Sequence, residues 1–316
     1  MLSEINQILE IVRKDGSVAS AKWPMTATLT PADVGLVERA GRYIRAQSIE
    51  EIDPVTLQKT SQKLGLKLTI EHHPVVGSTN RMLMQRGTLE DIGGLLITCD
   101  YQHAGRGRRG RSWVSPYARN LAFSFAHRSQ KPLSELGGLS CVVGIATVDA
   151  LTEAGVSDLK LKWPNDLWVN GKKLAGILVE LASKGPNTLV VIGIGINMAL
   201  TRQERSLIDQ PVTDLNSSGV KGGRSDLLMK IMQKLIGYLE HFEKTNFADF
   251  ISAFNALHVL HQQPVVVHPL VEHGNTEILG RVVGVGVSGQ LIVDTKVGPM
   301  EFLGGEVSLR PARSAD

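Results

Sequence analysis

The spacing of apolar residues near the N-terminus predicts two short helices. Residues 3–14 place isoleucine, leucine and valine side chains on one helical face, and Asp15-Gly16 ends the run. A second helix is predicted from Pro31 to Arg42. Because Asp53-Pro54 indicates a turn, the sequence predicts a small, mainly helical N-terminal segment that ends near this point.

Strands and helices are interleaved in the middle of the chain. Alternating or continuous apolar runs predict strands at 66–73, 93–102, 120–127, 159–166, 174–183 and 188–198. Helical spacing predicts helices at 78–87, 137–154, 225–246 and 247–259. This mixture predicts one α+β domain built on a mixed sheet.

The last part of the chain carries short apolar runs separated by glycine, asparagine and aspartate. Strands are predicted at 264–270, 277–287, 289–295 and 305–310, a pattern typical of a small β-barrel. The predicted organisation is an N-terminal segment at 1–62, a central domain at 63–261 and a barrel at 262–316.

Composition narrows the class of protein. Apolar residues make up 42% of the 316 residues and charged residues 21%, so a packed core is expected. The net charge of +3 excludes a generally basic nucleic-acid coat, and any anion must be bound by a local cluster. The N-terminus carries acids in place of a basic signal region, and no apolar run is long enough to span a membrane. We therefore expect a cytoplasmic protein.

The densest chemical signal is a basic, glycine-rich block. Residues 105–111 hold four arginines and three glycines without an acid. Glycines let consecutive N–H groups converge on an anion, and arginine offers a forked, permanently charged donor for phosphate. A solvated basic patch or a nucleic-acid arm has the same composition. The block lies between two predicted strands, however, and Trp113 and Pro116 follow it as anchors, which favours a polyphosphate-binding loop.

Two further segments carry polar residues at the ends of predicted strands. Pro164 interrupts the strand ladder, so Asn165 and Asp166 are expected to face a ligand, and a carboxylate there suits Mg²⁺. The alternative is an ordinary hairpin through Asn170-Gly171 with a solvated Lys173. Gly77-Ser78-Thr79-Asn80 is either a ligand-binding step or a helix cap.

Several motifs fail on context. Residues 284–289 match G-x-G-x-x-G, but a predicted strand follows where a dinucleotide-binding site needs a helix, so they are interpreted as barrel turns. No P-loop motif is present. His72 and His73 are adjacent on a strand and point to opposite faces, which makes them poor partners for one metal ion.

Taken together, the motifs resemble those of the biotin–protein ligases. The resemblance covers residues 65–312 and rests on GSTN at 77–80, YQHAGRGRRGRSWVSP at 101–116, KWPNDL at 162–167, KLAGILVE at 173–180, IGIGINM at 192–198 and GGEVSLR at 304–310. It implies a class II synthetase-like catalytic domain and a C-terminal SH3-like barrel. It also implies activation of biotin by ATP to biotinyl-AMP, then transfer to a lysine of the biotin carboxyl carrier protein of acetyl-CoA carboxylase.

The resemblance also implies roles for individual residues. Biotin is expected to contact Ser78, Thr79, Asn80, Gln102, Arg106, Gly107, Arg108 and Lys173. ATP is expected to contact Arg108, Arg111, Lys162, Asn165, Asn197 and Arg310. Lys173, Arg108 and Asp166 are the expected catalytic residues, and Asp166 is also the expected Mg²⁺ ligand. Asp166 is further hypothesised to help deprotonate the carrier lysine, whose unperturbed pKa is ~10.4.

Two departures from the family pattern leave alternatives open. Family members that also repress the biotin operon carry an N-terminal winged helix-turn-helix, and residues 1–60 show no clear second and third helix, so operator DNA is an uncertain partner. Some members cap adenine with a tryptophan after the GINM segment, whereas residues 199–215 hold no aromatic residue. A lipoate–protein ligase and a non-catalytic nucleic-acid binder remain the rival functions. A homodimer through an exposed edge of the central sheet is compatible with the sequence.

Overall fold

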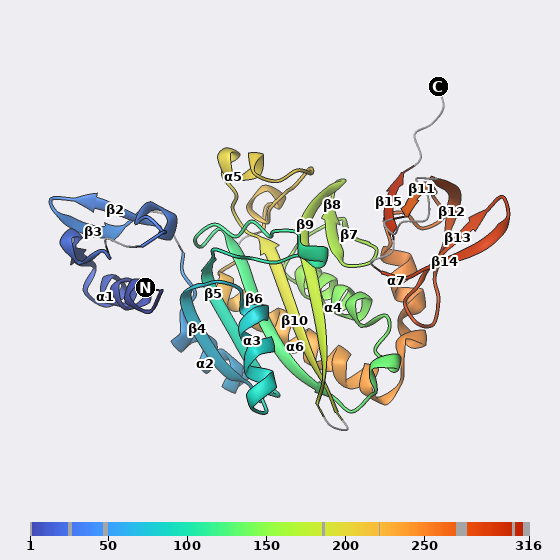
Figure 1. Cartoon of the computed structure of the whole chain (residues 1–316), viewed down its shortest axis with the longest axis horizontal. Coiled ribbons are helices and arrows are strands. Elements are labelled where there is room, and N and C mark those ends of the chain that lie inside the picture. The colour runs from blue at the N-terminus through green and yellow to red at the C-terminus, as the bar shows by residue number, and fades with distance from the viewer. Residues whose placement is uncertain are drawn as a thin grey trace.

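The computed structural model describes residues 2–24, 27–46, 50–184, 187–220, 222–269, 277–304 and 307–311. These residues form three sheets that follow one another along the chain. Figure 1 shows the N-terminal unit at one end of the molecule, a large sheet in the middle and the C-terminal sheet at the other end. We call residues 2–46 the N-terminal unit.

The N-terminal unit combines one helix with a small sheet. Helix α1 (Leu2–Asp15) confirms the helix predicted at 3–14 and buries the apolar face from which it was predicted. Strands β1 (Ser17–Ala19), β2 (Leu36–Arg39) and β3 (Arg42–Arg45) pair in the order β1-β3-β2. Between β1 and β2, the described residues form two 3₁₀ turns, η1 (Ser20–Lys22) and η2 (Ala32–Val34).

The helix predicted from Pro31 to Arg42 is wrong. Helical geometry stops after η2 at Gly35, whose φ is +70°. Ala40 and Gly41 also have positive φ angles, 48° and 71°, and form the two-residue turn between β2 and β3. Two consecutive residues with positive φ produce a hairpin and end a helix, so the turn decides the local structure here.

The central sheet has seven strands in the order β4-β5-β6-β10-β9-β8-β7. Their bounds are β4 Thr69–Val76, β5 Leu95–Gln102, β6 Asn120–Ser129, β7 Leu159–Lys162, β8 Asp166–Val169, β9 Lys172–Lys184 and β10 Asn187–Asn197. Strands β4 and β5 are parallel and the other neighbours are antiparallel, as the prediction of a mixed sheet requires.

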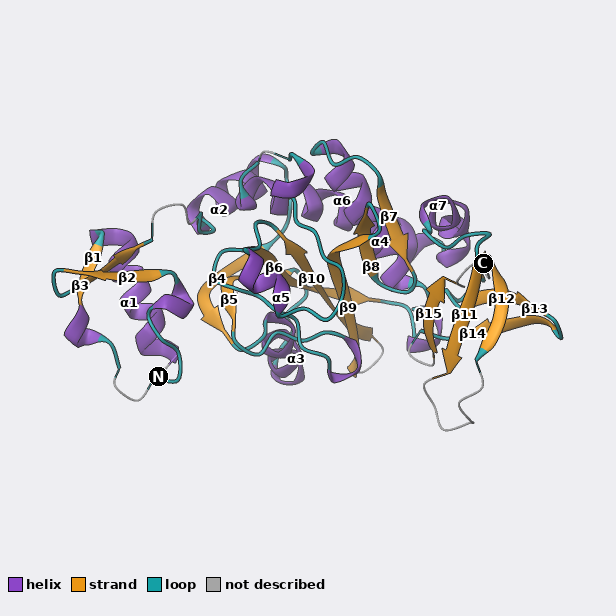
Figure 2. Ribbon diagram, turned by 90° about the horizontal axis from the view of Figure 1, so that it is seen from above, coloured by secondary structure: helices purple, strands orange, loops and turns teal. Residues whose placement is uncertain are grey.

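Helices cover the two faces of this sheet unequally. Figure 2 shows α2 (Pro54–Lys63), α4 (Leu139–Glu153) and α6 (Arg224–Lys244) on one face and α3 (Thr79–Leu89) on the other. Helix α4 is apolar over most of its surface, and it is buried between the sheet and α6. The face that carries α3 is therefore only partly covered, and the functional cavity lies there.

The apolar side chains inside the C-terminal barrel belong to the same core as those of the central domain. After η6 (Phe247–Phe250) and α7 (Ile251–Leu257), five strands pair in the order β14-β13-β12-β11-β15. They are β11 Pro264–Pro269, β12 Ile278–Val285, β13 Leu291–Thr295, β14 Gly298–Phe302 and β15 Val307–Pro311. The predicted fold class is confirmed, although β14 was missed, and the domain boundaries at 62 and 261 remain predictions. Among the described residues, no helix is both long and apolar enough to cross a bilayer.

A buried ion pair joins β5 to the start of α6. Arg224 donates to Asp100, and both side chains are at most 2% exposed. His72 Nε2 lies 3.1 Å from the same carboxylate, and the Ile52 N–H donates to it over 3.1 Å. Burial alone would raise the pKa of Asp100, but the Arg224 guanidinium and the His72 hydrogen bond outweigh it and hold that pKa well below its usual range.

Candidate functional site

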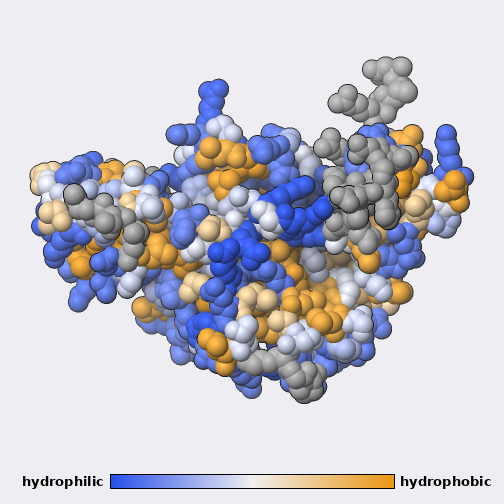
Figure 3. All heavy atoms as spheres, in the orientation of Figure 1, coloured by the Kyte–Doolittle hydropathy of each residue, from blue (hydrophilic) through white to orange (hydrophobic). Residues whose placement is uncertain are grey.

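One large cavity opens on the partly covered face of the central sheet. It has a volume of about 1010 Å³ and is lined by the start of α3, the loop after β5, the β7–β8 connection, β9, β10 and the segment 207–212. Figure 3 shows strongly hydrophilic side chains gathered in the middle of this face, between the N-terminal unit and the barrel. The predicted site residues that line it are Ser78, Thr79, Asn80, Gln102, Arg106, Gly107, Arg108, Arg111, Lys162, Asn165, Asp166, Lys173 and Asn197.

Two glycines of β10 make the floor of the cavity. Gly193 and Gly195 lie on one face of the strand, two residues apart. A Cβ atom at Gly193 would meet the Asn80 Oδ1 at 2.0 Å, and one at Gly195 would meet the Trp113 ring at 2.6 Å. The Gly-Ile-Gly pattern therefore lets Asn80 and Trp113 lie flat against the sheet.

The end of the cavity nearest α3 is neutral and already hydrogen-bonded. The Thr79 N–H and Oγ1 donate to Gln102 Oε1 over 2.9 Å and 3.2 Å. Ser124 lies 2.7 Å from Thr79 Oγ1 and donates to Asn80 Oδ1. Because the Gln102 oxygen is already satisfied, its NH₂ group is what this residue offers a ligand. We call this the neutral end.

Backbone hydrogen bonds shape the basic loop. Its two arms are joined by Trp113 N–H to Gly105 O at 2.9 Å and Gly107 N–H to Arg111 O at 2.7 Å. Arg109 and Gly110, with φ angles of 58° and 73°, turn the chain between the arms. A Cβ at Gly105 would lie 2.5 Å from Trp113 O, so the arms approach closely only with glycine there. The loop is a defined hairpin that presents arginines to the cavity.

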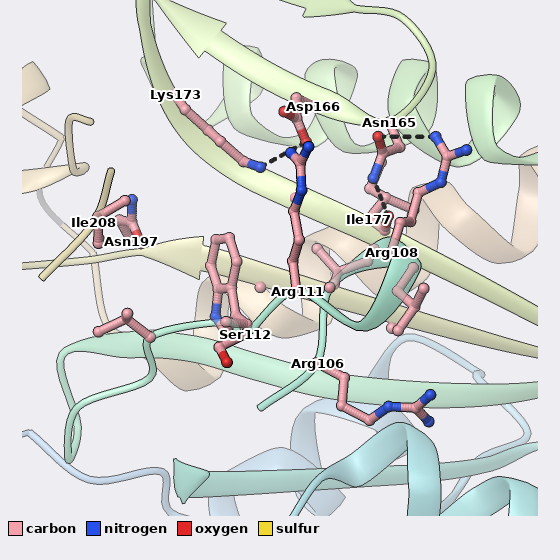
Figure 4. Close-up of a pocket in the computed structure, with 18 of the residues that line it drawn as sticks. Arg106, Arg108, Arg111, Ser112, Asn165, Asp166, Lys173, Ile177, Asn197 and Ile208 are labelled. Atoms are coloured by element: carbon pink, nitrogen blue, oxygen red, sulfur yellow. Dashed lines mark hydrogen bonds and ion pairs between the residues drawn. The ribbon is translucent and has the colours of Figure 1, made fainter. Parts of the chain in front are cut away.

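The opposite end of the cavity is cationic. Lys173 Nζ lies 2.8 Å from Asp166 Oδ1, and an Arg108 N–H donates to Asn165 Oδ1 over 3.3 Å. Figure 4 shows Arg111 reaching from the loop toward the Lys173–Asp166 pair, while Arg106 points the other way. Arg106 contacts Glu180 at 3.3 Å. Lys173, Arg108 and Arg111 thus face one space, which we call the cationic end.

Burial changes the character of Arg108. It lowers the pKa of the guanidinium, against the opposing effect of the Asp166 carboxylate. Arginine stays protonated even so, because its usual pKa exceeds 12. A partly desolvated guanidinium interacts more strongly with phosphate than an exposed one does.

Two tryptophan side chains also line the cavity. The Trp113 ring lies 5.7 Å from Lys173 Nζ, and the Trp168 ring lies 4.4 Å from Lys162 Nζ. The buried Nε1 atoms of both tryptophans have no partner among the described residues. The sequence predicted Trp113 as a loop anchor, and it is also part of the cavity wall. Trp168 and Ser124 were missed, although a lone serine between two phenylalanines of a strand is a usable signal.

The segment 207–212 closes the side of the cavity next to Lys173. Pro211 O accepts from the Lys173 N–H at 3.0 Å, and Lys173 O accepts from the Thr213 N–H at 2.9 Å. An Arg205–Asp214 ion pair fixes the base of the segment, and helix α5 (Arg202–Ser206) precedes it. Nothing in the sequence pattern indicated this role, because it depends on contacts between distant residues.

The remaining predicted residues have different positions. Asn197 donates to Thr213 O over 3.0 Å and accepts from Asn120 over 3.3 Å, so its amide ties the end of β10 to the segment that follows. Arg310 lies on β15, opposite Val266, but its side chain is outside the described part of the chain. Its predicted contact with the nucleotide stays a prediction.

Comparison with known proteins identifies relatives of this architecture. Residues 73–197 match the model of the Biotin/lipoate A/B protein ligase family. The bifunctional ligase/repressor BirA of Escherichia coli is 37% identical over 264 residues, which are 82% of this chain and 80% of that protein. The biotin–[acetyl-CoA-carboxylase] ligase of Paracoccus denitrificans is 32% identical and matches 65% of this chain and 86% of its own length.

The fold has solved counterparts as well. The biotin protein ligase from Aquifex aeolicus in complex with biotin and ATP superposes with a TM-score of 0.66 at 28% identity. The match covers 78% of this chain and 100% of that chain.

Proposed function

The chain belongs to the biotin–protein ligase family, and we propose that it joins biotin to ATP as biotinyl-AMP and then passes the biotinyl group to a carrier lysine. The observation that carries this proposal is the two-ended cavity. Its neutral end suits an uncharged, hydrogen-bonding ring system, and its cationic end suits phosphates. Both ends belong to one space, as a reaction between biotin and a nucleotide requires.

In the first step the biotin carboxylate attacks the α-phosphorus of ATP. A carboxylate-oxygen–phosphorus bond forms, the bond to the β-phosphate oxygen breaks, and pyrophosphate leaves. This step brings several negative charges together, so positioning and cationic stabilisation are its main needs. Lys173 at the cationic end suits the biotin carboxylate and the α-phosphate, while Arg108 and Arg111 suit the phosphate oxygens.

In the second step the carrier lysine attacks the acyl carbon of biotinyl-AMP. An amide bond forms, and AMP leaves with the electrons of the acyl–phosphate bond. The attacking amine must first lose a proton, and the Asp166 carboxylate beside Lys173 supports a role in accepting it. No protein nucleophile is needed in either step.

Magnesium is part of the proposal. Mg²⁺ is usually held by one or two carboxylates together with substrate phosphates, and Asp166 supplies a carboxylate at the cationic end. Asn165, which precedes Asp166, adds an amide oxygen beside that carboxylate, and Asn197 lines the same cavity. When bound, the ion would neutralise charge on the ATP phosphates.

Residues 199–215 contain no aromatic side chain, so the adenine ring must stack on another part of the cavity. We propose that it stacks on Trp113, with Ile208 opposite, because both line the cavity and the Trp113 ring lies beside Lys173. An indole provides the flat surface on which a base stacks.

The expected carrier is the biotin carboxyl carrier protein, and pairing of two chains through an edge of the central sheet is a possible assembly. Strand β9 pairs with β8 only over residues 172–176, whereas it pairs with β10 as far as Lys184. Among the described residues, the outer edge of β9 beyond residue 176 has no strand partner, and this supports pairing with another chain. Sedimentation velocity of Val179→Pro against the wild type tests the dimer, since proline removes a ladder donor.

The rival functions have less support. The Paracoccus denitrificans relative and the solved Aquifex aeolicus counterpart are both biotin ligases, which favours biotin over lipoate as the substrate. Operator binding is left out of the proposal, because the described residues between β1 and β2 hold only short 3₁₀ turns. A recognition helix needs several turns to lie in a major groove.

Transfer of labelled biotin to a carrier domain tests the proposed function. We expect ATP-dependent transfer by the wild type and a loss of about 100-fold or more for Lys173→Met, which removes the central cation. Lys172→Met is the matched control, because Lys172 is exposed and should leave the rate near that of the wild type. Wild-type protein that transfers no biotin, or transfers lipoate in its place, contradicts the assignment.

A further inference from the structure

The glycine-rich motif at 284–289 forms the part of the barrel that meets the central sheet and its helices. Residues 286–290, which we call the docking turn, connect β12 to β13. Gly286 donates to Gln290 O over 2.8 Å, and Gly289 donates to Gly286 O over 2.9 Å. The turn therefore has a fixed shape of its own.

The docking turn contacts the start of α4 backbone to backbone. A Cβ atom at Gly289, where φ is +75°, would lie 2.3 Å from Gly138 Cα. A Cβ at Gly137 would lie 2.5 Å from Ser288 O. Neither contact leaves room for a side chain, and at Gly289 the positive φ also favours glycine.

The same turn holds the segment that carries the cationic end. Trp163 is 4% exposed, and its Nε1 donates to Gly289 O over 3.0 Å. The next residue, Pro164, accepts from Ser140 at the start of α4 over 3.2 Å. Asn165 and Asp166 follow directly, and they contact Arg108 and Lys173. A chain of contacts thus runs from the docking turn to Arg108 and Lys173.

The barrel also approaches Arg108 at a second point. A Cβ atom at Gly304 would lie 3.2 Å from Arg108 Nη2 and 3.4 Å from Pro164 Cβ. The backbone at Gly304, two residues after β14, therefore lies close beside the guanidinium. The neutral end is held differently, because Thr79, Gln102, Ser124 and Asn80 bond to one another and to β9.

We propose that the docking turn and Trp163 are positioning residues for the cationic end, so that the barrel sets the geometry in which ATP reacts but not the geometry in which biotin binds. The inference rests on the proposed function, and it assigns a role to a motif that fails as a dinucleotide fingerprint. Displacement of Gly289 would be passed to Asn165 and Asp166 through Trp163.

Gly289→Ala tests this inference against the control Gly298→Ala. Gly298 also belongs to the barrel and has a positive φ of 109°, but a Cβ there meets nothing within 4 Å. Both changes strain a turn, and only the first breaks the contact with α4. For Gly289→Ala we expect the specificity constant for ATP in biotinyl-AMP formation to fall about tenfold or more, because small misplacements of reacting groups are costly. Biotin affinity, measured by calorimetry without ATP, should stay within about twofold.

Trp163→Phe provides a second test, because it keeps an aromatic ring but removes the hydrogen bond to Gly289 O. We expect the specificity constant for ATP to fall about fivefold, which is the effect of losing one hydrogen bond. Gly298→Ala should match the wild type in both measurements.

Three results overturn the inference: normal ATP parameters in a folded Gly289→Ala protein, equal losses of biotin and ATP binding, or unchanged ATP parameters in Trp163→Phe. Binding of a fluorescent ATP analogue to each variant tests the same contact if the wild type proves inactive. Inactive wild type contradicts the proposed function, whereas active wild type with insensitive variants contradicts only this inference.

Discussion

The N-terminal unit keeps most of its apolar side chains to itself, whereas the barrel shares its own with the central sheet and helices. The apolar cluster around α1 includes three buried side chains from outside the unit, Val75, Tyr117 and Ala118, and partly buried Tyr101 packs against it. Seven barrel side chains belong to the main core: Val265, Val267, Val282, Val285, Leu291, Val293 and Phe302. The barrel is therefore expected to unfold together with the catalytic core, and the N-terminal unit to unfold separately.

The polar contacts that join the N-terminal unit and the barrel to the central domain also differ. At the N-terminal junction Glu51 pairs with Arg45 and with Arg13, and accepts from Tyr117. These ionic side chains are 12% to 26% exposed, so salt reaches them. At the barrel junction His258 is 4% exposed, stacks on Phe254 and has no hydrogen-bond partner for its ring among the described residues. The first junction is sensitive to salt and the second to pH.

Removal of the barrel should have the largest effect. A chain that ends at residue 261 loses seven buried side chains from the main core, each worth about 1.5–3 kcal/mol. The sum of about 10–20 kcal/mol is as large as the stability of a typical domain or larger. We expect an unfolded or aggregated product, measured by circular dichroism and gel filtration. Cooperative unfolding of the shortened chain would contradict the comparison.

Asp100→Asn should cost about 3–5 kcal/mol, because it leaves the buried Arg224 charge without its counter-ion. The pKa of Asp100 is depressed in the folded state, so its contribution is present above the unfolded value of ~3.9 and is lost as the pH falls below it. Urea unfolding at neutral pH and in acid measures both effects. Asp91→Asn is the control, since Asp91 pairs with Arg128 at the surface and should change stability little.

His258→Phe should remove a pH dependence from the barrel junction. Burial, with smaller effects of His261 and Lys162, lowers the pKa of His258 from 6.5 to about 4. Between these values the unfolded chain binds a proton that the folded chain does not, so wild-type stability falls as the pH drops from 6.5 to 4. The loss amounts to about 3 kcal/mol. Urea unfolding should show a smaller loss in His258→Phe than in the wild type or in His241→Gln, an exposed control.

Glu51→Gln should have the smallest effect, about 1 kcal/mol at low salt. The wild type should approach the variant in thermal stability as salt rises toward about 1 M, because the Debye length then shrinks to about 3 Å. Differential scanning calorimetry measures both melting temperatures. A difference that does not change with salt would show that the N-terminal junction is not held by ionic contacts.

Sequence patterns predicted the central sheet and the barrel because long apolar runs with regular spacing have few alternatives. They failed between Pro31 and Arg42, where positive φ angles at Ala40 and Gly41 produce a hairpin. Apolar spacing does not encode that preference, and alanine gives no sign of it. The four-residue strand β8 and the five-residue strand β14 were missed as separate elements because short strands leave little periodicity.

The candidate site was predicted where residues near one another in the chain carry it. The basic loop and the Asn165–Asp166 step each have a local signature, and both line the cavity. Ser124 and the segment 207–212 enter the cavity through sheet pairing and backbone contacts between distant residues. Local patterns contain no information about such contacts.

The bare backbone of Gly193 and Gly195 limits how the protein can be redesigned. Any other amino acid at either position adds a carbon atom that would overlap with Asn80 or Trp113. Variants selected to accept altered nucleotide bases should therefore change the segment 207–212, whose Leu207 is 64% exposed, and leave strand β10 unchanged. A library built on this protein would place its diversity above the sheet.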